Sequence, residues 1–423
     1  YAVSNPSRGH AALNRQRARS EYAMTISTAQ IFRQGINAIL SQQEGLSRTQ
    51  AEIASGKRIQ TPSDDPSGAA KILDIEEQIA TAEQHLRNGE FALTELYLEE
   101  GAMTGAQNVL QRVRELMIQA NNDSQSESTR QGIATEVRAL RDELLALANT
   151  RNASGDYLFA GFQTDSLPFS INGGNVVYHG DQGQRRIQAG PSSLVPINDS
   201  GIDVFQLIKN GNGTLSVDNA SSNTGSGIVQ SLSQDNSLVS DTYSLNFIQL
   251  TPGDPVTYEV RDSSAALVSS GSYVSGESID FNGAVLVLNG VPANGDSFTV
   301  SPSVNQDVFA TLNNIITALE APSTELADNA NFHNDMAEGL NDIDQALDNF
   351  LRIRSNIGSR LNNLDRQAEV NENFLLRMQE AASQVQDLDY AEAISRLSAQ
   401  SISLEAAQKV FIEVQGLSLF NYL

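Results

Sequence analysis

Two adjacent carboxylates, Asp64 and Asp65, are the strongest candidates in this 423-residue sequence for side chains that do chemistry. Paired carboxylates can act as general acid and general base in hydrolysis. The pair lies in a turn ahead of a helical pattern, however, and Asp65 followed by Pro66 is typical of an N-cap and a first helical residue. We therefore interpret the two carboxylates as groups that begin a helix, not as a catalytic pair.

Other chemistry-bearing residues are few. The sequence contains no cysteine, which excludes disulfides and a thiolate nucleophile. The glycine-rich segments 211–214 and 225–227 lack the lysine and the following helix of a phosphate-binding loop, so we interpret them as flexible loops. No HxxxH or HExxH pair links the four histidines, which are His10, His85, His179 and His333. We predict no catalytic, cofactor-binding or metal-binding residue, and a protein that is not an enzyme.

The charge balance and the lack of long apolar runs argue against nucleic acid and membrane as partners. The chain carries 51 Asp and Glu against 27 Lys and Arg, a formal net charge of −24. Nucleic-acid binding needs clustered Lys and Arg, so we expect no nucleic-acid partner. Uninterrupted aliphatic runs are short, as in residues 284–288, whereas a membrane-spanning helix needs about 20 apolar residues. We therefore expect no membrane insertion.

The elements that position these residues change along the chain. Residues 24–161 and the segment from 306 onward are rich in Ala, Leu, Gln, Glu and Arg, which favour helices. The middle stretch, 165–305, holds 16 of the 30 glycines and 13 acidic residues against four basic ones. The sequence predicts an α+β fold, in which the N- and C-terminal arms form a long antiparallel helical or coiled-coil bundle that carries an inserted β-rich outer domain.

The first arm contains a heptad seam, two helix ends and two longer helices. Gly56 suits a helix C-cap, and a helical pattern then runs from Pro66 to about Ala120. Another helix is expected over 127–150. The heptad seam precedes these helices. Its positions follow one another at alternating spacings of four and three residues, and two of them are glutamine: Phe32, Ile36, Ile39, Gln43, Leu46, Gln50 and Ile53.

The last arm has two heptad registers. The first runs from Ile357 to Val385 and the second from Ala393 to Val414, with Leu397, Leu404 and Phe411 at seam positions of the second. The phase changes at residues 387–389, which predicts a joint between two helices. Two isolated amphipathic helices make a thin core, so we expect the terminal helices to need other subunits before they order fully.

The middle stretch predicts β-structure. Residues 256–260 alternate in hydrophobicity, and Asn282-Gly283 and Asn289-Gly290 flank a hydrophobic strand. Asn-Gly between strands is the strongest short-range signal for a hairpin. Asn294-Gly295 precedes a further strand at 298–300. Segments 157–169, 176–178 and 186–187 predict a smaller hairpin nearer the first arm.

Four segments resemble the hook–filament junction proteins of the bacterial flagellin family. They are residues 25–32; 54–59 with 63–66 and 69–70; 110–116 with 119–120; and 401–423, which end in Leu-Phe-Asn-Tyr-Leu where filament flagellins typically end in a Leu-Leu-Arg type tail. The resemblance covers 24–162 and 306–423. Residues 1–23 precede the usual start of this family, and we interpret them as an extra segment that is disordered or not native.

The resemblance implies a structural part of the extracellular bacterial flagellum that joins hook to filament and is needed for filament assembly and motility. Such proteins are exported unfolded through the flagellar type III channel with a cytoplasmic chaperone. They assemble as a ring of their own copies, with hook-associated protein 1 on the hook side and flagellin on the filament side, and the cap protein present during assembly. No cofactor is implied. A divergent flagellin that forms the filament itself remains an alternative, and a secreted hydrolase with helical arms finds no supporting site.

The resemblance also divides the chain and suggests interface residues. We expect terminal core helices at 24–56 with 389–423, a helical rod domain at 57–164 with 306–388, and the β-rich outer domain at 165–305. The helix around residues 110–120 resembles one that packs between neighbouring subunits in the family. The expected assembly residues are Phe32, Ile36, Ile39, Leu46, Ile53, Gln111, Arg112, Arg114, Glu115, Leu397, Leu404, Phe411, Val414 and Phe420.

Overall fold

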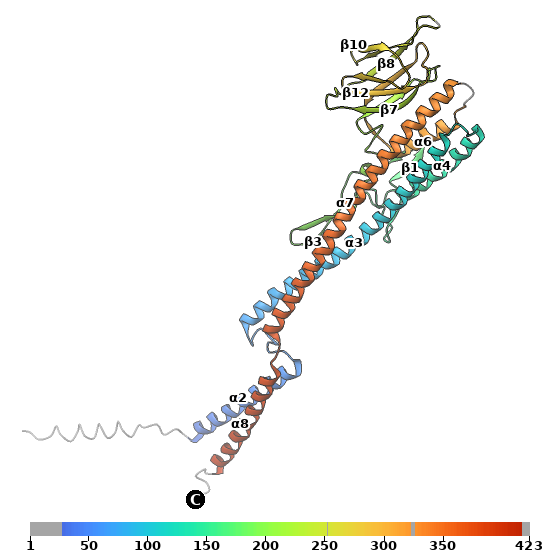
Figure 1. Cartoon of the computed structure of the whole chain (residues 1–423). Coiled ribbons are helices and arrows are strands. Elements are labelled where there is room, and N and C mark those ends of the chain that lie inside the picture. Colours follow the sequence, from blue (N-terminus) through green and yellow to red (C-terminus); the bar gives the residue numbers. More distant parts are fainter. Residues whose placement is uncertain (1–27, 252, 323–325, 417–423) are drawn as a thin grey trace, which may run out of the picture. The chain divides into compact units, whose positions relative to one another are not determined.

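A computed structural model describes residues 28–251, 253–322 and 326–416 (Figure 1). The chain divides into two compact units, and each is described by itself. The first unit comprises residues 1–81 and 373–423, and the second comprises residues 82–372. The extra N-terminal segment and Phe420 lie outside the described residues.

The first unit is built on two terminal helices, α2 (Thr28–Ser55) and α8 (Tyr390–Gly416). They run antiparallel, side by side (Figure 1). The unit also contains the start of α3 (Pro66–Ala120) and the end of α7 (Leu326–Gln386). The helix joint predicted at residues 387–389 is confirmed, since α7 ends and α8 begins there.

The connection between α2 and α3 confirms the capping interpretation. Gly56 has φ 71° and donates its N–H to the Glu52 carbonyl at 2.9 Å, as a left-handed helix C-cap does. Asp65 Oδ1 accepts from the N–H groups of Ser67 (3.1 Å) and Gly68 (2.9 Å), so it caps α3. Asp65 therefore has a structural role at the start of α3.

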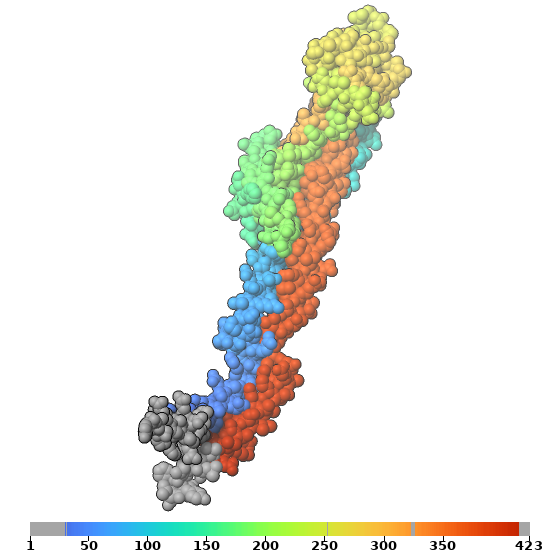
Figure 2. All heavy atoms as spheres, turned by 90° about the vertical axis from the view of Figure 1, so that its left-hand side faces the viewer, coloured from blue at the N-terminus to red at the C-terminus, as the bar shows by residue number. Residues whose placement is uncertain are grey.

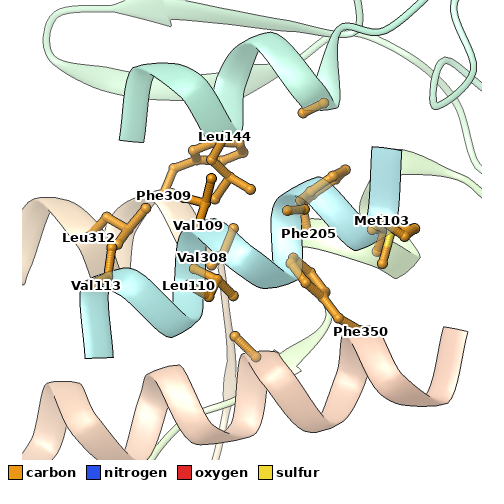
Figure 3. Close-up of a cluster of buried hydrophobic side chains, with 14 of the residues drawn as sticks. Met103, Val109, Leu110, Val113, Leu144, Phe205, Val308, Phe309, Leu312 and Phe350 are labelled. Atoms are coloured by element: carbon orange, nitrogen blue, oxygen red, sulfur yellow. The ribbon is translucent and has the colours of Figure 1, made fainter. Parts of the chain in front are cut away.

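In the second unit, four helices build the main hydrophobic core: α3, α4 (Glu127–Ala148), α6 (Val308–Glu320) and α7. The glycines within α3 do not interrupt it. Ser126 caps α4 and Asp307 caps α6, each through side-chain oxygens that accept backbone N–H groups. The Leu, Val and Phe side chains of these helices meet in the close-up of Figure 3.

Phe205 stands at the centre of this core. It is the last residue of the short helix α5 (Gly201–Phe205), and its ring lies 5.3–5.9 Å, centroid to centroid, from the rings of Phe159, Phe169, Phe309 and Phe350. Edge-on and tilted ring pairs add to the stabilisation from burial. Segments from both arms and from the middle stretch thus share one core (Figure 3).

The strands nearest the helices differ from expectation. β1 (Phe169–Asn172) pairs with β2 (Asn175–Tyr178), and β3 (Arg186–Gly190) pairs separately with β4 (Ser193–Pro196). The smaller hairpin predicted here is confirmed for Phe169 and residues 176–178, whereas the predicted participation of 157–168 and 186–187 is wrong. Residues 157–168 form turns, and their apolar members, 157–160, are buried against the helical core rather than in a strand.

The rest of the middle stretch forms two antiparallel sheets around a second core, here called the outer sandwich (residues 215–302). Figure 2 shows it as a lobe separate from the one formed by residues around 170–200. The strands are β6 (Leu215–Asn219), β7 (Ile228–Gln234), β8 (Tyr243–Ile248), β9 (Thr257–Arg261), β10 (Leu267–Ser272), β11 (Ser278–Phe281), β12 (Ala284–Asn289) and β13 (Ser297–Pro302), in the orders β10-β9-β8-β13-β6 and β11-β12-β7.

One of the two predicted Asn-Gly turns joins neighbouring strands. Asn282 (φ 45°) and Gly283 (φ 82°) connect β11 to β12, which confirms that hairpin. Asn289-Gly290 does not close a second one, because β12 pairs with β7 and β11 while β13 belongs to the other sheet. A pair of two-residue strands, β5 (Ile208–Lys209) and β14 (Asn305–Gln306), connects the sandwich to the helices.

The architecture confirms the α+β fold, with helical arms and a β-rich insertion. No helix in the described part of the chain is long and apolar enough to cross a membrane.

Candidate assembly surface of the terminal helices

The α2–α8 pair is closely packed because glycine lies at the contact. A Cβ added to Gly35 would lie 3.0 Å from Phe411 Cδ2, and one added to Gly45 would lie 3.5 Å from Gln400 Nε2. Because glycine has no side chain, the side chains of α8 can reach the α2 backbone at these two positions. The contact therefore depends on small and polar residues as much as on apolar ones.

An aromatic pair and an ion pair fix the two helices at either end. The Phe32 and Phe411 rings lie 4.8 Å apart with an interplanar angle of 50°. Arg396 Nη2 lies 2.6 Å from Glu52 Oε2, and the Glu52 side chain is mostly buried. These contacts fix the antiparallel register of the pair, although a partly exposed ion pair contributes only about 1 kcal/mol or less.

The joint between α7 and α8 rests on backbone hydrogen bonds. The Leu388 N–H donates to the Gly56 carbonyl at 3.0 Å, and the Arg58 N–H donates to the Gln386 carbonyl at 2.7 Å. Asp389 Oδ1 accepts from the N–H of Ala391 at 2.9 Å and so caps α8. Backbone hydrogen bonds thus connect the α2–α3 turn directly to the α7–α8 joint.

Asp64 supports this joint from the adjacent turn. Its carboxylate accepts from the Thr61 N–H (2.9 Å) and hydroxyl (3.0 Å) and from Arg48 Nη2 (2.5 Å). The Thr61 hydrogen bonds, together with Arg48, lower the pKa of Asp64 to about 2. A permanently ionised carboxylate at this turn is a structural anchor and not a general acid.

The seam residues predicted on α2 separate into two groups. Ile39, Leu46 and Ile53 are half-buried. Phe32 and Ile36 are 37% and 38% exposed, and Leu40, one turn further, is 55% exposed. Residues four apart share a face of a helix, so these three form an exposed apolar stripe, here called the α2 stripe.

On α8 the predicted seam is the half-buried side, while other faces carry exposed aliphatic residues. Leu397, Leu404 and Phe411 are half-buried. The side chain of Val414 lies outside the described residues. At 100° per residue the exposed aliphatic side chains point in different directions, so apolar residues surround the helix. These side chains, here called the α8 aliphatics, are 54–68% exposed: Ile394, Ile402, Val410 and Ile412.

The four residues predicted on α3 lie in the second unit. Gln111 is exposed. Arg112 pairs with Glu136 of α4 at 2.8 Å and with Glu115 at 3.0 Å, while Arg114 pairs with Asp344 of α7 at 2.6 Å. Both arginines therefore link helices within the chain, and their role between subunits stays a prediction.

Sequence reasoning missed a buried ionic cluster in the second unit. Arg360 forms two hydrogen bonds to Asp199 (2.8 and 2.9 Å), the Asp199 N–H donates to Glu99 (2.9 Å), and Arg185 lies 3.6 Å from Glu95. Burial, reinforced by the charge of Asp199, raises the pKa of Glu99 well above its usual value. Acidic residues four apart on the buried face of α3 were the available signal.

Within the described residues, no group of three or more His, Asp or Glu side chains is placed to hold a metal ion.

Comparison with known proteins identifies the family. Residues 26–164 match the bacterial flagellin N-terminal helical region, and residues 340–423 match the bacterial flagellin C-terminal helical region. Flagellar hook-associated protein 3 of Escherichia coli is 24% identical over 399 residues, which are 94% of this chain and 99% of that protein.

Two solved structures are more similar in sequence. The crystal structure of FlgL from Xanthomonas campestris is 33% identical with a TM-score of 0.68, and the match covers 73% of this chain and 99% of that one. Flagellar hook associated protein-3 from Legionella pneumophila is 34% identical with a TM-score of 0.72, over 74% of this chain and 98% of that one. The resemblance predicted from the terminal motifs is confirmed, and the chain belongs to the family of flagellar hook-associated protein 3.

Proposed function

We propose that the chain is a structural subunit that joins the flagellar hook to the filament and is needed for filament assembly and motility. It acts outside the cell, has no catalytic role, and forms a ring with further copies of itself. Its neighbours are hook-associated protein 1 on the hook side and flagellin on the filament side, and an export chaperone binds it in the cytoplasm. Membership of the hook-associated protein 3 family supports this placement.

The observation that carries the proposal is the unpartnered apolar surface of the terminal helices. Among the described elements, α8 has its main contact with α2 along one side; the α8 aliphatics lie exposed around α8, and the α2 stripe lies exposed on α2. A helix that is apolar all round is normally buried on all sides. Neighbouring copies and flagellar partners would supply that burial.

The proposed division of labour follows from this surface. Residues 24–56 with 389–423 form the inner contacts of the assembly, residues 57–164 with 306–388 form the surrounding wall, and residues 165–305 face outward. The exposed side of α3 at Gln111, Arg112 and Glu115 contributes to contacts between neighbouring walls. This assignment extends the resemblance of that segment to the packing helix of the family.

A deletion strain tests the proposal. Cells without the protein should build hooks, fail to attach or retain filaments, and release flagellin into the medium. Electron microscopy of the cells, with an assay for flagellin in the culture supernatant, measures both effects. Complementation with the intact gene is the control, and normal filaments on the deletion strain would contradict the proposal.

A divergent flagellin is the second candidate, favoured by the flagellin helical regions at both ends of the chain. The two candidates differ in self-assembly. A filament subunit polymerises alone from a purified monomer, whereas a junction subunit stops at a short assembly without its partners. Seeded polymerisation followed by light scattering separates them, and long filaments from the pure chain would favour the flagellin.

A further inference from the structure

The outer sandwich and the helical core of the second unit are held together by polar contacts. Their hydrophobic clusters are separate, and no apolar cluster joins them in the described part of the chain. Instead, α7 presents a polar strip to the sandwich. Asn331 accepts from Asn219 (2.9 Å), and Asn334 accepts from the Val229 N–H (2.8 Å). Each hydrogen bond of this kind contributes only modestly to stability, so the attachment of the sandwich to α7 is weaker than the packing within either core.

The same strip continues with carboxyl groups. The Gly211 N–H donates to Asp342 at 2.7 Å, and Gln306 Nε2 donates to its other oxygen at 2.8 Å. One turn earlier on α7, the Glu338 carboxyl lines the same cavity as Asp218 of β6 and lies in hydrogen-bonding contact with it. Two carboxyl groups can share a hydrogen bond only when one of them carries a proton. A proton is therefore part of the contact between α7 and the sandwich.

The surroundings of Glu338 favour that proton. Burial, together with the charges of Asp218, Asp342 and Asp335, raises the pKa of Glu338 to about 8. Two cavities of about 410 and 400 Å³ flank its side chain, so the contact between α7 and the sandwich is not closely packed at this point.

Few groups offset the negative charge of this cluster. From α7, Asp335 and Asp342 face the same space as Glu338, and Asp218 faces it from β6. From α3 comes Arg114, which is already paired with Asp344 of α7. The α6 residues that line the cavity are uncharged, and they include Thr311, Asn314 and Thr317. Loss of the shared proton would leave four carboxylates opposed with one committed cation.

We propose that the proton shared by Asp218 and Glu338 latches the outer sandwich onto α7, and that its loss at alkaline pH lets the sandwich move while both hydrophobic cores stay folded. The β5–β14 connection, with two residues in each strand, provides the pivot. The sign follows from the raised pKa: the contact is complete at acidic pH and weakens as the pH rises through about 8.

The full chain is suited to a distance measurement because it contains no cysteine. Spin labels on Ser270→Cys in β10 and Ser359→Cys in α7 report the distance between the sandwich and the helix, and both positions are exposed. Pulsed electron–electron double resonance should give a narrow distribution of the label-to-label distance at pH 6 that broadens at pH 9. The circular dichroism spectrum should stay unchanged. A distribution that stays narrow at both pH values would overturn the proposal.

Two variants assign any change to the latch. Glu338→Gln and Asp218→Asn each keep a donor for the remaining carboxylate at every pH, so both should stay narrow at pH 9. Glu372→Gln, an exposed change elsewhere on α7, should broaden as the parent chain does. If one latch variant does not fold, the other decides, and broadening of a folded latch variant to the parent's extent would contradict the proposal.

Discussion

The α2–α8 pair and the helical core of the second unit are both made of amphipathic helices, yet they bury very different surfaces. In the core, Leu96, Met103, Leu110 and Phe350 are completely buried. Among the described side chains of α2 and α8, only Thr49 and Ala393 are buried, and both are small. The core can stabilise itself, whereas the terminal pair has apolar surface to offer but little that it buries alone.

The two regions therefore serve different purposes: the second unit folds on its own core, and the terminal helices offer surface for assembly. A helix pair held by glycine contacts, an aromatic pair and an ion pair gains little free energy against the entropy of ordering about 55 residues. The second unit gains its stability from a continuous cluster of Phe, Leu, Ile and Val side chains. We therefore expect substitutions in the two regions to affect different measurements.

The largest expected effect on the free energy of unfolding lies in the core. Phe350→Ala removes a completely buried ring that packs 5.6 Å from Phe205, and should destabilise the monomer by about 3–5 kcal/mol. Urea denaturation of the monomer measures this change. Leu351→Ala, at the exposed neighbouring position, is the matched control and should cost less than about 1 kcal/mol. Equal effects would mean that the core is not the stabilising region.

An intermediate effect should appear in the pH dependence of the core. Because burial raises the pKa of Glu99 in the folded state, the native chain holds a proton that the unfolded chain releases. Stability from this group is complete below the unfolded pKa and is lost as pH rises towards the folded pKa. Glu99→Gln mimics the neutral acid, so its melting temperature should fall less than that of the parent chain at alkaline pH.

Thermal melts between pH 5 and pH 9 test this expectation. Glu90→Gln, an exposed carboxylate on the same helix, serves as the control and should follow the parent chain. A Glu99→Gln variant that loses stability with pH as steeply as the parent would show that Glu99 is ionised in the folded chain.

The smallest effect on the monomer is expected at the terminal pair. Phe411→Ala should leave the monomer's melting temperature nearly unchanged, because its ring contacts Phe32 but remains half-exposed. If neighbouring subunits bury the ring, the assembly loses about 3–5 kcal/mol per site, and motility of the complemented deletion strain should fall. Export should be normal, and Ser398→Ala on the exposed side of α8 is the control. A monomer melt lowered by several degrees with intact motility would assign Phe411 to folding.

Local signals in the sequence predicted much of the fold. Gly56, Asp65 and the Asn282-Gly283 turn act through their own backbone geometry, so their roles could be predicted without knowledge of distant partners. The helix joint at residues 387–389 followed from the change in heptad phase. The first strand of the small hairpin was predicted to begin too early, because residues 157–160 are apolar and fill the helical core. A short apolar run does not distinguish a strand from a buried turn.

The candidate site was harder to predict because several of its contacts lie at glycine and at charged side chains. The heptad pattern on α2 identified Phe32 and Ile36, which are exposed, but could not identify Gly35 and Gly45, since glycine gives no hydrophobic signal at a contact. The buried cluster around Glu99 depends on Asp199, 100 residues away in the sequence, and no local pattern connects them.

Hydrogen exchange on a verified monomer and on the assembled junction can show whether the terminal helices are protected only in the assembly. The buried part of α3 around Leu110 should be strongly protected in both states. Exchange across Thr28–Ser55 and Tyr390–Gly416 should be rapid in the monomer, with protection appearing only in the assembly. Strong protection of both terminal helices in the monomer would contradict the claim that their apolar surface serves other subunits.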